Sequence, residues 1–249
     1  MNLEEILKEK FLNPKSKNIF KYIYYFFQKI KKERNVKKSY SGGAIDLIVD
    51  HYFKDKKEGV YVDVGAYHPF NGSNTYKLFS RGWSGINLDL DQQTIDAFNF
   101  FRPNDENICE AVSNNVEEKK FYFHHNRSAI NTLDERMGYR AKEIRKIKTT
   151  TLNNILEESK FKLSDIDFLS IDVEGHEIDV IKGIDLEKFP IKIIVIEHQD
   201  PKMKKVEFYN QDIERTIQSD IYNYMTSKNY CLINWLHSDL VFINKNFQD

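Results

Sequence analysis

Four ionisable side chains surround one glycine in the segment Ser170–Glu177 (SIDVEGHE): Asp172, Glu174, His176 and Glu177. Histidine exchanges protons near neutral pH and a neighbouring carboxylate can orient its ring, so this cluster predicts acid–base catalysis or metal binding. The structural alternative is that acidic side chains at the start of a helix stabilise the helix dipole. We take His176 as the first candidate for a general base, with Asp172 or Glu174 assisting it.

A second polar segment, Glu197–Asp200 (EHQD), follows an apolar run. His198 in this segment could supply a second base, a substrate contact or a metal ligand, and His68 is a further candidate base. The spacing matches neither the HExxH zinc motif nor a two-histidine, one-carboxylate triad. A divalent metal is therefore left open, with no residue assigned to it.

Carboxylates also end two earlier apolar runs. Asp63 is followed by Gly65 and Ala66, small residues that let a ligand approach the backbone closely. The next glycine is Gly72, so the segment lacks the GxGxxG pattern of dinucleotide-binding loops, and its acid suits a cationic ligand such as an ammonium group. Asp89 ends the second run, where a carboxylate can accept both hydroxyls of a ribose. The simpler interpretations are a turn glycine at Gly65 and a helix cap at Asp89.

The elements that must position these side chains alternate between strand and helix patterns after a break at Tyr40–Gly43. The expected strands are 59–64, 85–90, 107–112, 167–172 and 192–197, with an extra edge strand at 119–125. The expected helices are 73–81, 92–101, 152–159, 177–182 and 209–227, and a hairpin of strands 230–235 and 240–244 closes the pattern. This alternation predicts an α/β fold with an open, mostly parallel sheet, helices on both faces and an antiparallel terminal hairpin. Ligands bind such sheets beyond the carboxyl ends of the strands, where the charged side chains lie.

The chain has 249 residues, of which 41% are hydrophobic and 30% charged, which is typical of a globular protein with a large core. Its net charge of −1 argues against a nucleic-acid partner. Cys109 and Cys231 form no CxxC pair, so neither a disulfide scaffold nor a cysteine zinc site is expected. No secretory signal is visible. The apolar stretch Ile19–Ile30 is too short to cross a membrane, because a membrane-spanning helix needs about 20 apolar residues. We therefore expect a cytoplasmic protein.

The first 38 residues differ from the rest in charge, with 11 Lys and Arg against 4 Asp and Glu, whereas the remainder has 26 against 34. Apolar side chains from Ile19 to Ile30 recur at helical spacing. We expect residues 1–55 to form a helical, basic and aromatic extension and residues 56–249 to form the α/β domain. The favoured interpretation is that this extension packs on the domain or in a homodimer. Docking to an anionic membrane or a nucleotide diphosphate is the alternative.

Three segments, DVGAYHP-x-x-GSNT (63–75), GWSGINLD (82–89) and IDVEGHEIDVIKG (171–183), together resemble the FkbM family of methyltransferases. The resemblance covers residues 63–244, and the DVEGHE block is its most specific part. It implies a class I, S-adenosyl-L-methionine-dependent methyltransferase domain with a Rossmann-like sheet of seven strands, the last of them antiparallel. Leu90 and the loop Tyr67–Pro69 depart from the common pattern, but neither removes a carboxylate that the cofactor needs.

The resemblance also implies which residues bind the cofactor. The methionine end of S-adenosylmethionine is assigned to Asp63, Gly65 and Ala66, and Ser73, Asn74 and Thr75 complete the pocket. The adenosine end is assigned to Asp89, Ala111 and Val112.

Members of this family typically methylate hydroxyl groups of sugars and natural products. The resemblance therefore implies an O-methyltransferase that acts on a sugar or nucleotide-linked sugar in bacterial capsule or surface polysaccharide biosynthesis. Methyl transfer is an in-line displacement, and a hydroxyl acceptor needs a base that removes its proton. The alternatives are methylation of an amine or a phosphate-type oxygen, a nicotinamide-dependent oxidoreductase, and a non-catalytic ligand-binding subunit.

Overall fold

The structure, a computed structural model, describes residues 5–6, 9–10, 15, 17–33, 37–162, 166–198 and 212–247. The chain divides into two compact units, Met1–Lys38 and Ser39–Asp249. The first unit contains helix α2 (Asn18–Glu33), as predicted from the apolar spacing. Helix α3 (Ile45–Tyr52) belongs to the second unit, so residues 39–55, which were expected in the extension, are part of the α/β unit. Within the described part of the chain, no helix has the length and apolar character needed to cross a bilayer.

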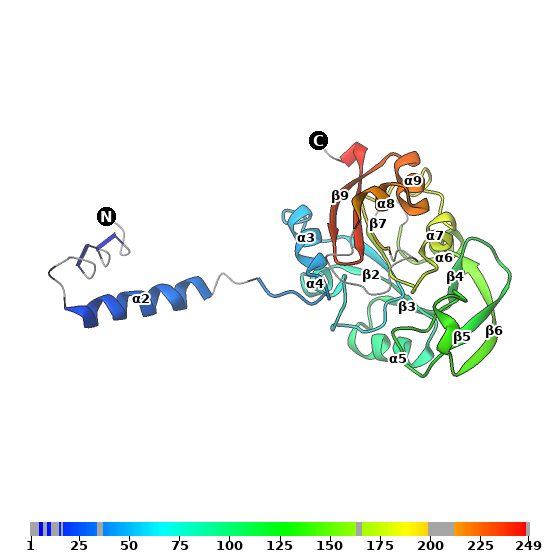
Figure 1. Ribbon diagram of the computed structural model, residues 1–249, viewed down its shortest axis with the longest axis horizontal. Helices are drawn as coiled ribbons and strands as arrows, with labels where there is room; N and C mark the ends of the chain where they lie inside the picture. The colour runs from blue at the N-terminus through cyan, green and yellow to red at the C-terminus, as the bar shows by residue number, and fades with distance from the viewer. Residues whose placement is uncertain are drawn as a thin grey trace. The chain divides into compact units, whose positions relative to one another are not determined.

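Seven strands form the central sheet of the second unit, in the order β3-β2-β1-β7-β8-β10-β9 (Figure 1). The parallel strands are β1 (Val60–Val64), β2 (Ser84–Asp89), β3 (Glu106–Cys109), β7 (Ile166–Ile171) and β8 (Ile193–Glu197). Strand β10 (Asp239–Asn244) runs antiparallel to both its neighbours, β8 and β9 (Tyr230–Leu236). This confirms the predicted Rossmann-like sheet with its antiparallel terminal hairpin.

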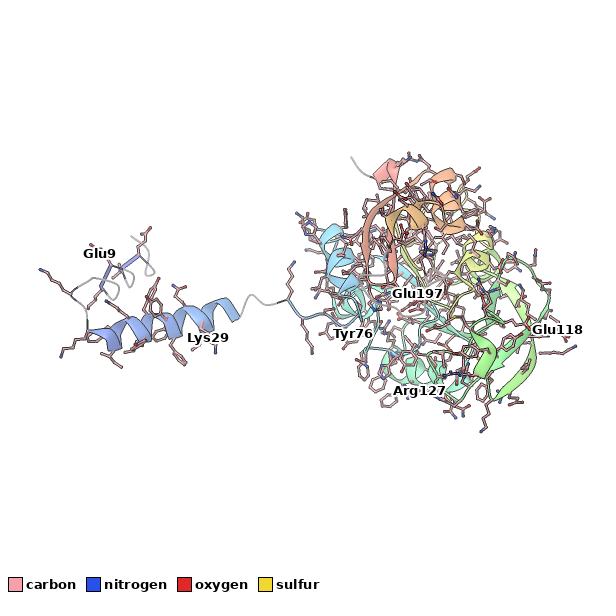
Figure 2. All side chains as sticks on the ribbon, in the orientation of Figure 1. Glu9, Lys29, Tyr76, Glu118, Arg127 and Glu197 are labelled. Atoms are coloured by element: carbon pink, nitrogen blue, oxygen red, sulfur yellow. The ribbon has the colours of Figure 1, made fainter. Side chains whose placement is uncertain are left out.

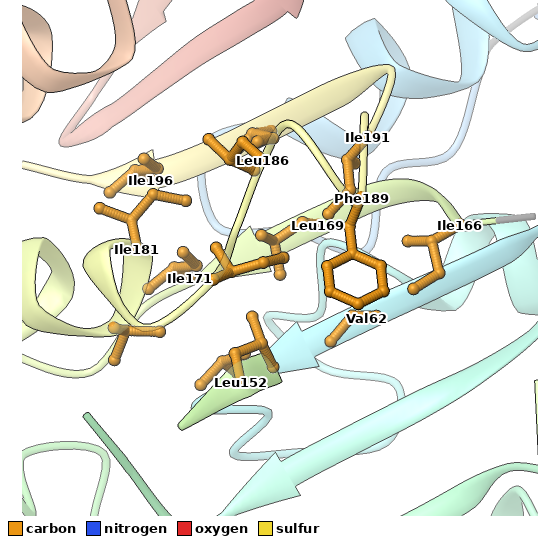
Figure 3. Close-up of a cluster of buried hydrophobic side chains, with 14 of the residues drawn as sticks. Val62, Leu152, Ile166, Leu169, Ile171, Ile181, Leu186, Phe189, Ile191 and Ile196 are labelled. Atoms are coloured by element: carbon orange, nitrogen blue, oxygen red, sulfur yellow. The ribbon is translucent and has the colours of Figure 1, made fainter. Parts of the chain in front are cut away.

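Alternate residues of the strands face two different layers of helices. In β8, Ile194 and Ile196 join a buried cluster with helices α6 (Leu152–Glu158), α7 (Glu177–Lys182) and α9 (Asp220–Ser227) (Figure 3). Ile193 and Val195 join a second cluster, with α3 and α4 (Tyr76–Ser80). Successive side chains of a strand point to opposite faces, so a strand buried on both faces is apolar at every position. The sheet is therefore the middle of three layers.

The helix predictions differ in accuracy. Helix α5 (Gln92–Phe101) has the predicted bounds, and the side chain of Asp91 caps it by accepting a hydrogen bond from Gln93 N. The single long helix predicted over 209–227 is wrong in its described part, because α8 (Ile213–Ile217) and α9 are separate helices. Ser219 lies between them and caps α9 by accepting a hydrogen bond from Tyr222 N. Residues 209–211 lie outside the described residues.

Three further strands form a small separate sheet, in the order β4-β6-β5. They are β4 (Ala111–Ser113), β5 (Glu118–Phe123) and β6 (Glu143–Thr151). The strand predicted over 107–112 is therefore wrong in its second half, because the chain leaves the central sheet at Glu110 and β4 pairs with β6. The predicted edge strand 119–125 exists as β5, but it pairs with β6 rather than with the central sheet. Strand β6 is mostly exposed and lacks the apolar alternation that would have predicted it.

Candidate active site

Two adjoining cavities open at the carboxyl ends of the parallel strands. The first comprises about 570 Å³ of empty space, including its opening to solvent, and its lining includes Asp89, Val112 and His176. The second comprises about 430 Å³ of empty space, likewise including its opening to solvent, and its lining includes Asp63, Ala66, Ser73 and Asn74. The residues common to both linings are Gly65, Tyr67, Ala129, Asp172 and Glu174. The fold thus brings the polar ends of β1, β2 and β7 into one site, as the strand pattern predicts.

Gly65 is required where the ends of β1 and β7 meet. Its backbone has a φ of +80°, and a Cβ at this position would collide with the carbonyl oxygen of Asp172. The backbone N–H groups of Gly65 and Ala66 both donate to the carbonyl oxygen of Leu88, at 2.9 and 3.0 Å. Gly65 is therefore a turn glycine, and it also forms part of the wall of both cavities.

Asp63 is a buried carboxylate that borders the second cavity. Only 5% of the surface of Asp63 is exposed. Its Oδ2 accepts a hydrogen bond of 2.7 Å from the hydroxyl of Thr75. Burial raises the pKa of Asp63 to about 6, although the Thr75 hydrogen bond and the charge of Arg102 act in the opposite direction. Thr75 is itself fully buried and belongs to the lining of neither cavity. Thr75 therefore reaches the second cavity only through its hydrogen bond to Asp63.

Arg102 is a fully buried residue that fixes the loop after β1. Its guanidinium donates to the carbonyl oxygen of Pro69 at 2.8 Å, to Ser73 Oγ at 3.0 Å and to Thr75 Oγ1 at 2.8 Å. It also donates to Asn87 Oδ1 at 3.3 Å, which ties the loop to strand β2. Sequence reasoning missed this residue, because an arginine at the end of a helix belongs to no local motif.

Asp89 accepts hydrogen bonds from the backbone at both carboxylate oxygens. Tyr67 N donates to Oδ2 at 3.0 Å and Asp91 N donates to Oδ1 at 2.8 Å. Burial raises the pKa of Asp89 to about 6. A carboxylate offers about four lone-pair positions, so further hydrogen bonds from a ligand remain available. The alternative in which Asp89 caps α5 is wrong, because Asp91 is the capping residue.

Of the two residues predicted to flank the adenine, Ala111 and Val112, only one lines a cavity. Val112 belongs to the lining of the first cavity, whereas Ala111 belongs to the lining of neither. Both residues lie in β4, where successive side chains point to opposite faces. Glu110 and Leu90 are further residues in the lining of the first cavity.

His176 lies at the first cavity with both ring nitrogens near polar partners. Its Nε2 is 3.0 Å from Ser113 Oγ, and its Nδ1 is 3.2 Å from the carboxylate of Asp179. Burial lowers the pKa of His176, and the Asp179 carboxylate opposes this effect. These contacts fix the ring between β4 and α7. To take a proton from a substrate, the imidazole would have to exchange one of these partners.

The other two candidate histidines belong to the lining of neither cavity. The backbone N–H of His198 donates to the carbonyl oxygen of Ser238 at 2.7 Å. The Nδ1 of His68 accepts hydrogen bonds from Phe70 N at 3.3 Å and Asn71 N at 3.1 Å, which shape the loop after β1. Burial lowers the pKa of His68.

Carboxylates gather at the ends of β7 and β8. One side-chain oxygen each of Asp172, Glu177 and Glu197 lies within 4.8 Å of the others, close enough for a single divalent cation to bridge them. Figure 2 shows Glu197 in the interior of the second unit. Burial and the neighbouring Glu197 raise the pKa of Glu177 to about 7. Asp239, opposite Glu197 in the sheet, also has its pKa raised to about 7 by burial and by Glu197.

Asp172 is the member of this group that borders both cavities. The residue keeps an exposed surface, while the protein atoms packed around its carboxyl group disfavour the charged form. Burial, followed by the charges of Glu197 and Glu174, raises the pKa of Asp172 well above its usual value. Its carboxyl group can therefore hold or accept a proton at a higher pH than an ordinary aspartate.

The connection between β5 and β6 covers part of the site. Ser128, Ala129, Asn131 and Leu133 from this connection belong to the lining of the first cavity. Thr132 anchors it, since its hydroxyl donates to the carbonyl oxygen of Glu174 at 2.8 Å. These residues were missed from the sequence, because their segment carries neither a motif nor a periodic pattern.

Comparison with known proteins identifies the family. The family model for the methyltransferase FkbM domain matches residues 63–230, which is more than half of the chain. This range contains every residue in the lining of the two cavities. No curated protein and no solved structure gives a significant match. The chain therefore belongs to the FkbM methyltransferase family.

Proposed function

We propose that the protein is an S-adenosylmethionine-dependent O-methyltransferase that methylates a hydroxyl group of a sugar or nucleotide-linked sugar. The reaction would serve the synthesis of a bacterial capsule or another surface polysaccharide. The two free cysteines are in keeping with a reducing, cytoplasmic location. The observation that carries the proposal is the pair of adjoining cavities, with Asp89 at one and Asp63 at the other.

The residues at the two cavities suit the two ends of this cofactor. Asp89 would accept hydrogen bonds from the ribose hydroxyls, with Val112 beside the adenine. Asp63 would interact with the ammonium group of the methionine part, with Ser73 and Asn74 nearby. When bound, the cofactor supplies an electrophilic methyl group on a sulfonium.

A hydroxyl acceptor becomes a good nucleophile only when a base removes its proton. We assign this step to Asp172, which borders both cavities and has a raised pKa, with Glu174 beside it in both linings. In this assignment His176 positions the turn after β7 through Ser113 and Asp179. The sequence prediction that His176 itself is the base stays a prediction that the same experiment tests.

The test compares methyl transfer from radiolabelled S-adenosylmethionine by Asp172→Asn and His176→Asn. Acceptor sugars, nucleotide sugars, amines and phosphate compounds are assayed separately, each with and without EDTA. We expect Asp172→Asn to lower turnover about 100-fold or more while the Kd for S-adenosylhomocysteine stays within about threefold. Removing one carboxylate from a crowded group relieves repulsion, so this variant should fold. The exposed Asp220→Asn is the matched control.

Different results would contradict different parts of the proposal. Full turnover by Asp172→Asn together with loss of turnover by His176→Asn would assign the base to His176. Transfer only to amines or phosphates would refute the sugar hydroxyl as acceptor. Loss of activity in EDTA that added Mg²⁺ restores would show that the reaction needs a divalent metal. Absence of any calorimetric signal with S-adenosylhomocysteine would refute the cofactor assignment.

A further inference from the structure

Helix α2 carries an apolar face that the first unit itself leaves uncovered. Six large side chains on this face are each at least 38% exposed: Ile19, Phe20, Ile23, Phe26, Phe27 and Ile30. At 3.6 residues per turn, these positions fall within about 120° of the helix circumference. A continuous apolar stripe of this width normally lies against a partner.

The rest of the helix surface is cationic and aromatic. By helical position, Lys21 and Gln28 lie opposite the apolar face, and Lys29 lies between them and the edge of this face. Tyr22 and Tyr25 are exposed outside the apolar stripe. The sequence has no acidic residue between Lys10 and Glu33, and residues 1–38 carry 11 basic against 4 acidic side chains.

We propose that α2 docks on an anionic lipid surface, lying along the bilayer with its six apolar side chains inserted between the headgroups. Aliphatic and phenylalanine side chains on one face with lysines on the other are the pattern of interfacial helices. The lysines would then face the phosphates of the lipid headgroups. Tyr22, next to the edge of the apolar stripe by helical position, would lie at the boundary, where one end of its ring is apolar and the other wet.

Charge favours lipid over a second copy of the chain. Pairing two α2 helices would satisfy the apolar face, but it would bring together two segments that each carry seven excess positive charges. An anionic surface satisfies both the apolar face and the lysines. This distinguishes the lipid surface from a homodimer, which was one of the two packing partners, with the α/β domain, that the sequence favoured.

The test is co-sedimentation of the full chain with sucrose-loaded vesicles. One set contains phosphatidylcholine alone, and the other contains phosphatidylcholine with about one third phosphatidylglycerol. We expect binding to the anionic vesicles that is about tenfold stronger than to the neutral ones and that weakens when salt rises from about 0.1 M to about 0.5 M. Equal sedimentation with and without vesicles would overturn the proposal.

Two double variants locate the binding face. Ile23→Gln with Phe27→Gln changes the centre of the apolar face, and Tyr22→Gln with Tyr25→Gln replaces two exposed aromatic residues outside it. We expect the first variant to lower the vesicle partition coefficient about tenfold or more, and the second to lower it less than about threefold. Equal losses in the two variants would contradict docking through this face.

Light scattering and thermal unfolding decide between lipid and protein partners. The proposal predicts that both variants keep the size of the wild-type particle and its unfolding midpoint. If Ile23→Gln with Phe27→Gln dissociates a dimer, the occupant of the face is a second copy and the proposal is wrong. If the same variant lowers the unfolding midpoint of the α/β unit, the face packs on that unit and the proposal is also wrong.

Discussion

The hydroxyl of Thr75 donates a hydrogen bond of 2.7 Å to the carboxylate of Asp63. The same hydroxyl accepts a hydrogen bond of 2.8 Å from Arg102. A hydrogen bond or a positive charge beside a carboxylate favours its ionised form, whereas burial favours the protonated form. Thr75 and Arg102 therefore keep the pKa of Asp63 lower than burial alone would make it. Two residues outside the cavity linings thus set the charge of a residue at the second cavity.

Replacing Thr75 with valine should weaken cofactor binding without changing the shape of the side chain. The valine leaves a buried carboxylate oxygen of Asp63 without its donor, and Arg102 loses one acceptor. We expect the Kd for S-adenosylhomocysteine at pH 7 to rise by up to about tenfold. The lost hydrogen bond stabilised the charged form of Asp63 by about 1–3 kcal/mol, so its loss raises the pKa of Asp63 further and leaves less of this carboxylate ionised to attract the ammonium group. Isothermal titration calorimetry measures this change. Thr75→Ser keeps the hydroxyl and should bind within about threefold of wild type; equal losses in both variants would show that the hydroxyl is not the cause.

Cofactor affinity should fall as the solution becomes acidic. The pKa values of Asp63 and Asp89 are both raised to about 6 by burial, so each carboxylate becomes protonated as the pH falls through this value. A protonated Asp63 no longer attracts an ammonium group. We expect a nearly constant Kd for S-adenosylhomocysteine between pH 8 and 7, and about a tenfold rise per carboxylate between pH 7 and 5. In Asp63→Asn the pH dependence should become shallower; a Kd that is independent of pH in the wild type would contradict the assignment.

The central sheet could be predicted because its strands are buried on both faces and are therefore apolar almost throughout. The apolar segments that form β1, β7 and β8 are bounded by polar residues or glycine. Each of these strands ends at a residue of the candidate site or immediately before one. Parallel strands then place these ends at one edge of the sheet. This is why Asp63, Asp89 and Asp172 could be assigned to one site from sequence alone.

The features that could not be predicted from the sequence depend on contacts between residues far apart in the chain. Arg102 acts through Pro69, Ser73 and Thr75, none of which is near it in sequence. Strand β6 has few buried side chains, so its pairing with β5 and not its own pattern makes it a strand. The ring contacts of His176 with Ser113 also join residues far apart in the chain.

Replacing Gly65 with alanine should disrupt the fold rather than the chemistry. The alanine Cβ would collide with the backbone carbonyl of Asp172, and the φ of +80° already disfavours an L residue. We expect a loss of about 3 kcal/mol or more in the free energy of unfolding, or no folded protein. The control is Gly72→Ala, because Gly72 has a φ of +74° but nothing within 4 Å of an added Cβ. Gly72→Ala should cost only about 1 kcal/mol; chemical denaturation that finds equal losses would refute the steric argument.

The raised pKa of Glu177 should make the fold less stable as the pH rises from about 4 to about 7. Burial and Glu197 raise the pKa of Glu177 from 4.5 to about 7. A group with a raised folded-state pKa contributes stability that is complete below its unfolded pKa and is lost as the pH rises through the folded value. The loss therefore falls between about pH 4 and pH 7, where the unfolded chain releases this proton and the folded chain keeps it.

Glu177→Gln isolates this effect because the amide cannot ionise. Glu177 Oε1 accepts hydrogen bonds from Val173 N at 3.1 Å and Gly175 N at 2.8 Å, and the amide oxygen of glutamine can accept both. We expect little change in the free energy of unfolding at pH 4 and a gain of about 1–3 kcal/mol at pH 8, measured by urea denaturation. The exposed Glu135→Gln is the matched control and should give no such gain. If Glu177→Gln destabilised the protein equally at both pH values, the lost interaction would be one that glutamate makes in both protonation states, and the electrostatic explanation would fail.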